Sequence, residues 1–353
     1  VKINKIIIAT ESQLTWTPRK KYGFSAQQIN ELKQYLPTPQ QSIELLHSVA
    51  LAASKIGIDV EHMIIDDIDN AINKIRLSAS KKTCVWVVSD GRVFHNSSPI
   101  CAWLKNVNIQ VFGIDTTIQS LTDNKYLMTV IAERHGLLIP ESRLYQGTRK
   151  LAEIAGFNSQ KGFFVKPNTL GSQIGISSNS RVSSLSQAVE ISENLYQKYG
   201  VDSLIQSYID GVDYRVSVIE RKKGDIEFNC SKISISNNLN QKQEFSTNRT
   251  ESGRKWHLEA VTSFNSPVYK ESKKVVNQLY NIGLINCYAG IDLRGTDKGG
   301  YFFLENNVKP FISNSFSILA KELSYSSLGE MFIDSIINRC KDQNQLSHRY
   351  FHE

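Results

Sequence analysis

Two acidic side chains and one amide near residue 300 form the group best suited to chemistry. Asp292 and Glu305 lie in the sequence IDLRGTDKGGYFFLENN, on two expected strands that a short turn joins. Asn307 follows Glu305 by two residues, so strand alternation places both side chains on one face. Two carboxylates and an amide oxygen form the hard, all-oxygen set that Mg²⁺ prefers when phosphates complete its shell. The alternative is a surface hairpin with solvated carboxylates. The apolar residues beside Glu305 disfavour it, because a buried carboxylate needs a partner.

A second group of residues, FFVKPNTLGSQIGIS, joins an apolar strand to a turn of small residues. Lys166 ends the strand and could place its ammonium group over a nucleotide phosphate. The turn residues Gly171, Ser172 and Gln173, with Gly175 after them, allow backbone N–H groups to approach an anion closely. The order of residues does not match a Walker A loop. An ordinary Gly-Ser turn is the alternative for this segment taken alone.

The segment SLIQSYIDGVDYRV indicates a strand, a turn and a second strand. Gln206, Ser207 and Tyr208 could present backbone N–H and C=O groups to an adenine edge. Asp213, just beyond the turn, could accept hydrogen bonds from ribose hydroxyls. Arg215, on the second strand, could meet a phosphate or a substrate carboxylate. Taken singly, each of these residues also fits an ordinary surface position.

The first part of the chain supplies a scaffold for these residues. Up to about residue 115, short β-branched runs alternate with helical patterns, which predicts a parallel sheet covered by helices. The expected strands are Lys5–Ala9, Val60–Ile65, Thr83–Val88 and Ile109–Gly113, and the expected helices are Pro39–Ile56, Asp67–Leu77 and Pro99–Leu104. The polar residues between 11 and 38 are expected to be a long insertion.

A second stretch begins at about residue 121. Thr122 or Asp123 is expected to cap a helix, which places Lys125 in its first turn. An exposed lysine at the start of a helix is the alternative for Lys125. Beyond the Lys166 strand, we expect another strand from Ile176. A helix is then expected between a Ser184 cap and Gly200.

The third stretch is expected to be mainly strands. They are Leu204–Ile209, Tyr214–Glu220, Ile226–Ile235, Tyr288–Leu293 and Tyr301–Asn306, with helices at Val268–Ile282 and Leu328–Cys340. The polar residues 237–255 form a long loop, and such loops are typically functional.

Composition excludes several classes of protein. The chain has 353 residues, of which 41% are hydrophobic and 21% charged, which fits two or three packed units. No apolar run reaches the roughly 18 residues of a membrane span, and the first residues fit a strand better than a signal peptide. The net charge of +7 comes without a basic tract or a nucleic-acid motif, so no nucleic-acid or membrane partner is expected. The cysteines never form C-x-x-C, which favours a reducing cytoplasm.

In this order the motifs resemble the ATP-grasp ligase superfamily. Two segments are similar to D-alanine–D-alanine ligases: DNKYLMTVIAERHGLLIP and VKPNTLGSQIGIS. Three other segments are similar to the ribosomal-protein glutamate ligases: QSYIDGVDYRV, EFSTNR and AGIDLRGTDKGGYFFLENN. The resemblance covers about residues 121–317. It implies an α/β protein, α+β in its C-terminal part, with an ATP-grasp fold behind an N-terminal Rossmann-like pre-ATP-grasp domain. The implied domains are 1–118 (pre-ATP-grasp), 119–203 (central lid subdomain) and 204–353 (C-terminal, with the metal site).

The resemblance also implies which residues bind the cofactors. Two lysines would hold the ATP phosphates, the turn at 171–175 would cover them, and the segment 206–209 would contact adenine. The implied ATP-binding residues are Lys125, Lys166, Gly171, Ser172, Gln173, Gln206, Ser207, Tyr208, Ile209 and Asp213. Asp292, Glu305 and Asn307 would hold two Mg²⁺ ions, for which Mn²⁺ could substitute.

The chain departs from the D-alanine ligase pattern where that family binds its substrates. The family's Gly-Gly-x-Ser-x-Glu stretch is replaced by ATESQLTWTP, in which Glu11 is the expected substitute. Pro310-Phe311 replaces a Pro-Gly pair and reshapes the acceptor pocket, where Ser313 and Ser315 could bind a carboxylate. A substrate pair other than two D-alanines is therefore expected.

A further departure concerns the donor to the acylphosphate. Gly290 stands where the D-alanine ligases have an arginine two residues before the metal-binding aspartate. The expected replacements are Arg215, Asn248, Arg249 and Arg254. The last three lie in EFSTNRTESGRKW, where the D-alanine ligases have a tyrosine-bearing lid.

The predicted function is an ATP- and Mg²⁺-dependent carboxylate–amine ligase that joins amino acids or small peptides. The resemblance implies an acylphosphate intermediate with release of ADP and phosphate, which needs positioned cations rather than a covalent nucleophile. A true D-alanine–D-alanine ligase, a ligase that extends a protein tail and a non-catalytic ATP-binding regulatory module stay open as alternatives. The expected partners are small molecules, and a homodimer is compatible with the family.

Overall fold

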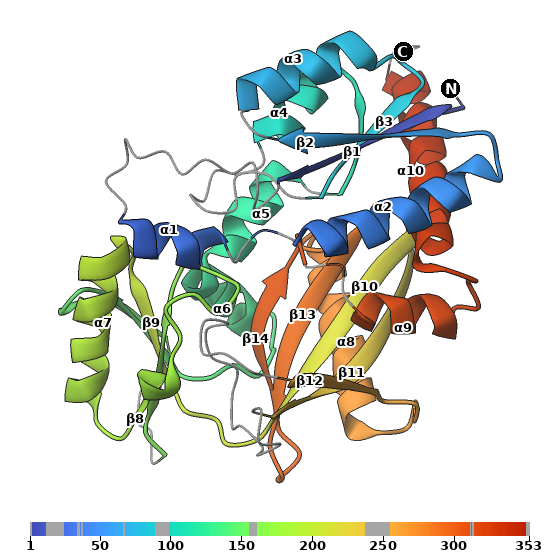
Figure 1. The fold of residues 1–353 in the computed structure, drawn as a ribbon. Coiled ribbons are helices and arrows are strands. Elements are labelled where there is room, and N and C mark those ends of the chain that lie inside the picture. Colours follow the sequence, from blue (N-terminus) through green and yellow to red (C-terminus); the bar gives the residue numbers. More distant parts are fainter. Residues whose placement is uncertain are drawn as a thin grey trace.

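Three β-sheets, each formed by its own stretch of chain, make up the fold (Figure 1). This computed structural model describes residues 2–11, 25–33, 36, 38–65, 68–88, 99–113, 115–154, 161–236, 255–310, 312 and 314–350. Among them, no helix combines the length and the apolar character that crossing a membrane requires.

The N-terminal sheet is parallel, with strand order β2-β1-β3-β4. Its strands are β1 (Lys5–Glu11), β2 (Asp59–Ile65), β3 (Thr83–Val87) and β4 (Gln110–Phe112), and the helices in the same stretch of chain are α1 (Ala26–Leu32), α2 (Pro39–Ser54), α3 (Ile68–Ser78) and α4 (Pro99–Asn106). Figure 1 shows α1 away from this sheet, beside the central part of the chain. Six of the seven residues of β1 are buried, as expected for an inner parallel strand covered on both faces. α2 begins at Thr38, whose hydroxyl accepts from the backbone N–H of Gln41 in a capping box.

The central sheet is antiparallel, with strand order β6-β5-β9-β7-β8. Its elements are β5 (Ser142–Gln146), β6 (Arg149–Ile154), β7 (Phe163–Pro167), a 3-10 helix (Ser178–Ser180), β8 (Arg181–Val182), α7 (Leu185–Tyr199) and β9 (Ser203–Ser207). α7 begins after the Ser184 cap and ends at Gly200, whose φ of 68° lets the chain leave the helix in the left-handed conformation.

The C-terminal sheet is also antiparallel, with strand order β12-β11-β10-β13-β14. Its elements are β10 (Val212–Lys222), β11 (Asp225–Ser236), β12 (Lys255–Ala260), α8 (Pro267–Asn281), β13 (Tyr288–Gly295), β14 (Tyr301–Asn307), α9 (Asn314–Glu322) and α10 (Leu328–Tyr350). Two helices, α5 (Thr116–Asp123) and α6 (Lys125–Arg134), connect the N-terminal sheet to the central one. Figure 1 shows α10 rising from the C-terminal sheet to lie along the N-terminal one.

One hydrophobic core joins the N-terminal and C-terminal sheets. Trp86 of β3 lies 4.7 Å from Phe332 of α10 between ring centroids, and its indole N–H donates to the Tyr288 hydroxyl at 3.0 Å. The central sheet has its own core, formed with α7 by residues between 145 and 205. The first and third sheets are therefore packed as one body, and the central sheet is packed separately.

Most expected elements are present, with several corrections. No strand begins at Ile176, because Ser177 caps the short 3-10 helix there. Neither Thr122 nor Asp123 caps the helix at Lys125, since α5 runs through both of them and Asn124 is the cap. The sequence patterns missed α1, α5, α9, β5, β6, β8 and β12. The loop expected over 237–255 lies outside the described residues except for residue 255, which begins β12.

The expected domain boundaries stay a prediction. In the sheet pairing, β9 hydrogen-bonds to β5 and β7, so the central sheet extends to Ser207. All five cysteines are free and buried, as expected for small apolar residues of a core.

Candidate active site

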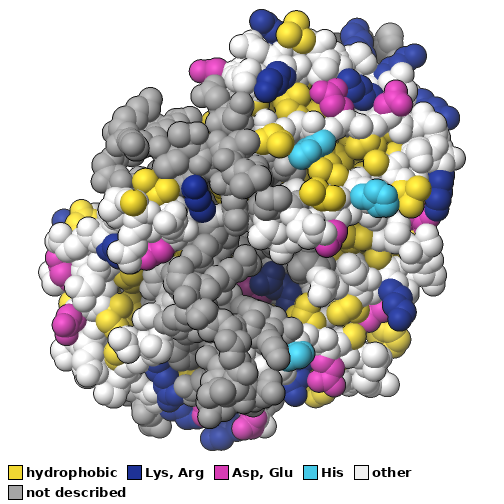
Figure 2. Space-filling view, in the orientation of Figure 1, with side chains coloured by type: hydrophobic (Ala, Val, Ile, Leu, Met, Phe, Trp, Pro, Cys, Tyr) yellow, Lys and Arg dark blue, Asp and Glu magenta, His cyan; other side chains and the backbone are white. Residues whose placement is uncertain are grey.

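A cavity of about 300 Å³ lies between the central sheet and the C-terminal sheet. Small-molecule sites span about 300–1,000 Å³, so the cavity suits a bound ligand. Figure 2 shows basic and acidic side chains together in a hollow near the middle of one face. The cavity is lined by fourteen of the predicted site residues: Lys125, Lys166, Gly171, Ser172, Gln173, Gln206, Ser207, Tyr208, Ile209, Asp213, Arg215, Asp292, Glu305 and Asn307. The fold thus brings together four segments that are far apart in the sequence.

The acidic side of the cavity is built by β13 and β14. Asp292 lies directly across from Glu305 in the antiparallel pair, next to a bulge at Leu304. The side-chain amide of Asn307 donates to Oε1 of Glu305 at 2.8 Å. The two carboxylates and the amide therefore lie on one side of the sheet, as the spacing predicts.

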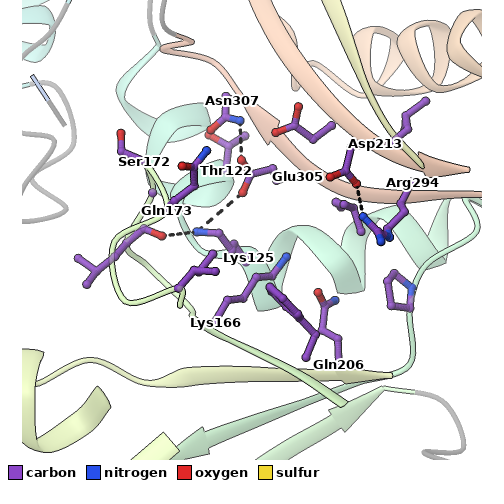
Figure 3. Close-up of a pocket in the computed structure, with 18 of the residues that line it drawn as sticks. Thr122, Lys125, Lys166, Ser172, Gln173, Gln206, Asp213, Arg294, Glu305 and Asn307 are labelled. Carbon is purple, nitrogen blue, oxygen red and sulfur yellow. Dashed lines mark hydrogen bonds and ion pairs between the residues drawn. The ribbon is translucent and has the colours of Figure 1, made fainter. Parts of the chain in front are cut away.

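Two lysines from different elements face this acidic group (Figure 3). Nζ of Lys125, at the start of α6, donates to the carbonyl of Leu170 at 2.7 Å and lies 3.9 Å from Oε2 of Glu305. Lys166, on β7, is 7% exposed. Its ammonium group has no hydrogen-bond or ion-pair partner among the residues that the structure describes. Burying a cation without a hydrogen-bond partner is costly, and an anionic ligand would relieve that cost.

The charges of these groups perturb one another. Burial, assisted by the Lys125 ammonium group, lowers the pKa of Lys166 to about 8, although the Glu305 carboxylate acts in the opposite direction. Burial raises the pKa of Glu305, but Lys125 and Lys166 outweigh it, so the net shift is downward. Burial also raises the pKa of Asp292, assisted by the neighbouring Glu305 and opposed by Arg215. The cavity therefore holds an ionised Glu305 between two cations.

Arg215 lies across from Asp292 on the adjacent strand β10. Its Nη2 donates to Oδ2 of Asp292 at 3.1 Å, and its Nε lies 2.5 Å from Oδ1 as an ion pair that lacks hydrogen-bond geometry. A Cβ added to Gly290 would lie 2.9 Å from Cβ of Pro310 and 3.3 Å from Nη1 of Arg215. The absence of a side chain at position 290 leaves the space that the Arg215 guanidinium occupies.

The hinge between β9 and β10 forms the opposite side of the cavity. The N–H groups of Ser207 and Tyr208 donate to the carbonyls of Glu141 and Gly162, each at 2.9 Å. These two N–H groups are thus used within the protein rather than offered to a ligand. The N–H of Ile209 makes no hydrogen bond among the described residues, so it is the hinge donor that a nucleobase can reach.

Beyond the hinge, Asp213 is paired with an arginine. Nη1 of Arg294, on β13, donates to Oδ1 of Asp213 at 2.7 Å (Figure 3). Burial lowers the pKa of Arg294, but the Asp213 carboxylate outweighs it and raises the pKa. Arg294 therefore stays charged.

The turn after β7 has an unusual backbone. Ser172 and Gln173 have φ angles of 50° and 63°, the left-handed region that side chains other than glycine rarely adopt. Consecutive left-handed residues carry strain of about 1–3 kcal/mol each, and such strain is typical of ligand-binding segments. The start of α6 holds the adjoining chain, because Asn168 bonds to both Asn124 and the N–H of Tyr126.

Of the other five predicted site residues, two do not line this cavity and three lie outside the described residues. Glu11 is buried at the carboxyl end of β1, outside the cavity lining. Ser315 is buried at the start of α9, where its hydroxyl accepts from Ser217 at 2.7 Å. Asn248, Arg254 and Ser313, together with the alternative donor Arg249, lie outside the described residues.

Sequence reasoning missed two buried cations in the cavity lining, Arg294 and Lys309. Arg294 lies one residue beyond the expected strand Tyr288–Leu293, whereas β13 runs to Gly295, so alternation places Arg294 on the same face as Asp292. Lys309 follows Asn307 by two residues, just past the end of β14. α5 also contributes to the lining through Gln119, Thr122 and Asp123.

The donor set fits a magnesium ion that enters with a nucleotide. The described residues contain no group of three or more His, Cys, Asp or Glu residues that would hold a metal by themselves. Two carboxylates with one amide oxygen leave several positions of an octahedron open, and Mg²⁺ typically fills these with phosphate oxygens and water.

The sequence of this chain matches the family model for the D-Ala–D-Ala ligase C-terminus over residues 146–337, more than half of its length. The chain belongs to this family. The match includes the hinge and both strands that carry the acidic group, and it ends within α10. No curated protein sequence matches the chain.

Solved structures share the fold of this family member over nearly its whole length. The D-alanine–D-alanine ligase from Bacillus anthracis has a TM-score of 0.66 at 15% identity, covering 96% of this chain and 99% of its own. The same enzyme complexed with ATP has a TM-score of 0.64 at 14% identity, with 97% and 99% coverage. The L-amino acid ligase from Bacillus licheniformis has a TM-score of 0.61 at 13% identity, with 96% and 75% coverage. The chain has the ATP-grasp fold.

Proposed function

We propose that this chain is an ATP-dependent carboxylate–amine ligase that forms a peptide or other amide bond between amino acids or small peptides. The observation that carries the proposal is the convergence of Lys125 and Lys166 on Glu305 across from the hinge. A triphosphate brings several negative charges, and this cavity supplies buried cations to receive them beside carboxylates suited to a metal. Family membership and the likeness to an ATP complex support the same conclusion.

In this proposal the nucleotide spans the cavity from the hinge to the acidic group. The Ile209 N–H meets the adenine edge, and the Asp213 carboxylate accepts from the ribose hydroxyls. Lys125 and Lys166 hold the phosphates under the turn at 171–175. Lys166 supports this role best, because its ammonium is buried and lacks a described partner.

Asp292, Glu305 and Asn307 are proposed to hold Mg²⁺, as two ions, with Mn²⁺ as a substitute. The metal would supply charge neutralisation between the phosphates and the two carboxylates. The residues of the chain then do the positioning. The Asp292–Glu305 pairing across adjacent strands fixes the spacing of the carboxylates, and the Asn307 amide orients Glu305.

The proposed reaction transfers the γ-phosphoryl group to a substrate carboxylate, which gives an acylphosphate and ADP. Attack by an amine then releases phosphate and forms the amide bond. The chain needs no covalent nucleophile for this, because positioning and charge stabilisation carry phosphoryl transfer. Arg215 is the proposed donor to the acylphosphate oxygens. Its guanidinium lies beside Asp292, next to the space that a side chain at position 290 would fill. Asn248 and Arg254 stay predictions for the same role.

The substrates are proposed to be amino acids or small peptides, as the names of the similar structures span D-alanine and L-amino acid ligases. Glu11 and Ser315 lie outside the nucleotide cavity, so any contact with substrate would be made on its far side. Ser313 stays a prediction, as do a homodimer and a cytoplasmic location.

The test is nucleotide turnover by the purified chain with Mg-ATP and pooled amino acids. ADP should form only with particular amino acids, and a product should appear whose mass equals their sum less water. Glu305→Ala should abolish both signals, while Lys74→Met, an exposed change on α3, should leave them intact. AMP as the product would contradict the acylphosphate route.

The alternatives give different results in the same assay. Product from D-alanine alone would identify a D-alanine–D-alanine ligase. Turnover only with an acidic protein acceptor would identify a ligase of protein tails. ATP binding without turnover on any acceptor would identify a regulatory module.

A further inference from the structure

Arg294 is a buried cation of the cavity lining that donates to three neighbouring groups. It lies on β13, two residues beyond Asp292, and is 6% exposed. Its Nε donates to the carbonyl of Ile209 at 2.5 Å, its Nη1 to Oδ1 of Asp213 at 2.7 Å, and its Nη2 to the Tyr208 hydroxyl at 3.0 Å. All three nitrogens of the guanidinium therefore bind either the hinge residues Tyr208 and Ile209 or Asp213, which lies just beyond the hinge.

This geometry separates Arg294 from the phosphate-binding lysines. The Lys166 ammonium lacks a described partner and can receive an anion, whereas Arg294 is already committed to a carboxylate, a carbonyl and a phenol. Its guanidinium also lies 5.5 Å from the centroid of the Tyr208 ring, against which Arg181 stacks at 4.0 Å. A planar group with fixed donors suits the task of holding several acceptors in one arrangement.

We propose that Arg294 is a positioning residue for ribose recognition, which holds the Asp213 carboxylate and the hinge in the geometry that a nucleotide requires. The inference rests on the proposed function, since it takes Asp213 as the ribose acceptor. Arg294 binds one carboxylate oxygen, Oδ1. The other, Oδ2, has no hydrogen-bond donor among the described residues, so it is free to accept from a ribose hydroxyl.

The pairing of β10 with β13 also links the proposed ribose acceptor to the acidic group. Asp213 lies directly across from Arg294 in the sheet, and Arg215 lies directly across from Asp292. One pair of strands therefore sets both the ribose acceptor and the metal carboxylate. Fixing Asp213 through Arg294 aligns the sugar with the phosphate end of the site.

The test compares ATP with 3′-deoxy-ATP and 2′-deoxy-ATP by calorimetric titration of the whole chain. The variants are Arg294→Met, Asp213→Asn and the double variant, and Arg149→Met on the exposed surface of β6 is the matched control. Wild type should bind ATP about tenfold or more tightly than at least one deoxy analogue, as expected for a hydrogen bond to a charged group. Arg294→Met should weaken ATP binding about tenfold while hardly changing the affinity for that analogue. The preference for ATP should then fall to about one. The double variant should be no weaker than Asp213→Asn, because the two residues act as a unit.

Each other outcome contradicts a specific claim. A preference that survives in Arg294→Met, or its absence in wild type, overturns the positioning role while nucleotide binding stands. Failure of wild type to bind any adenine nucleotide overturns the proposed function itself. Should Arg294→Met not fold, Arg294→Lys answers the same question. Its single ammonium cannot bind all three acceptors, so the preference should fall to an intermediate value.

Discussion

Replacing Lys166 by methionine should make the free protein more stable and remove its response to nucleotide. The ammonium group is buried, has no described partner and lies near the positive charge of Lys125. Methionine has a similar length and keeps the apolar contacts of the lysine stem, but it carries no charge to desolvate. Function and stability therefore oppose each other at this residue.

The magnitude follows from the pKa of the group. Burial lowers the pKa of Lys166 from 10.5 to about 8, even with Glu305 nearby. At about 1.4 kcal/mol per pKa unit, this difference corresponds to at most about 3.5 kcal/mol of unfolding free energy, and relaxation around methionine should leave about 1–3 kcal/mol. For a unit of this size, that gain corresponds to a rise in Tm of about 2–8 °C.

The pH dependence gives the sign independently. Between pH 8 and 10.5 the unfolded chain holds a proton on this lysine that the folded chain has lost, so stability from this group rises with pH. The advantage of Lys166→Met should thus be full below pH 8 and should shrink toward pH 10.5. Thermal unfolding of wild type, Lys166→Met and the exposed control Lys74→Met at pH 7 and pH 9.5 measures both effects.

Two results would refute this reasoning. If Lys166→Met melts at or below the temperature of wild type while Lys74→Met is unchanged, the lysine stabilises the free protein and is not a strained anion receptor. If Lys166→Met still gains stability from added ATP to the same extent as wild type, the phosphates bind elsewhere.

Three further variants test other contacts of the site. Glu305→Gln should abolish product formation yet bind metal-free ATP several-fold more tightly in titrations with a chelator, because Lys125 loses an anion that competes with phosphate; weaker binding would contradict this. Gly290→Ala should lower kcat by about tenfold or more and should also lower Tm, since the new Cβ would clash with Pro310 and crowd Arg215; an unchanged kcat would count against that arginine. Glu31→Gln, on α1, should destabilise the protein by about 1–3 kcal/mol, because it weakens the bonds to Lys198 and Tyr199 of α7. The pKa of Glu31 is lowered in the folded protein, so the carboxylate contributes stability above pH 4.5. The difference between variant and wild type should fade as the pH falls below 4.5 and the carboxylate becomes protonated. A constant difference down to pH 3 would show that its charge is not involved.

The sequence predicts the local parts of the site well. Alternation places Glu305 and Asn307 on one face, and the structure has them 2.8 Å apart between side-chain atoms. The Ser184 cap and the Gly200 end of α7 are local chemistry, and both are confirmed. The strand expected from Ile176 fails for a local reason too, because Ser177 caps a short 3-10 helix there.

The pairing of residues distant in sequence could not be predicted. Arg294 was overlooked although alternation places it beside Asp292, since only the register of β10 against β13 shows that Asp213 faces it. Gly290 was interpreted as a loss of a donor. The structure shows that it also makes room for an arginine from the neighbouring strand.

The arrangement of the cores indicates how ligand binding is linked to the fold. Residues of the N-terminal sheet and of α10 share one core with β10 and with Tyr288 of β13, so the acidic group stands on a body built from both ends of the chain. Lys166 and the 171–175 turn belong to the central sheet, whose core is its own. Polar contacts join the two bodies: Lys125, on a helix packed against the C-terminal sheet, donates to the Leu170 carbonyl, and Arg294 donates to the Ile209 carbonyl of the hinge. A triphosphate held by Lys166 on one side and by the acidic strands on the other would therefore add bonds between two separately packed bodies. Nucleotide should then stabilise their association more than it stabilises either core.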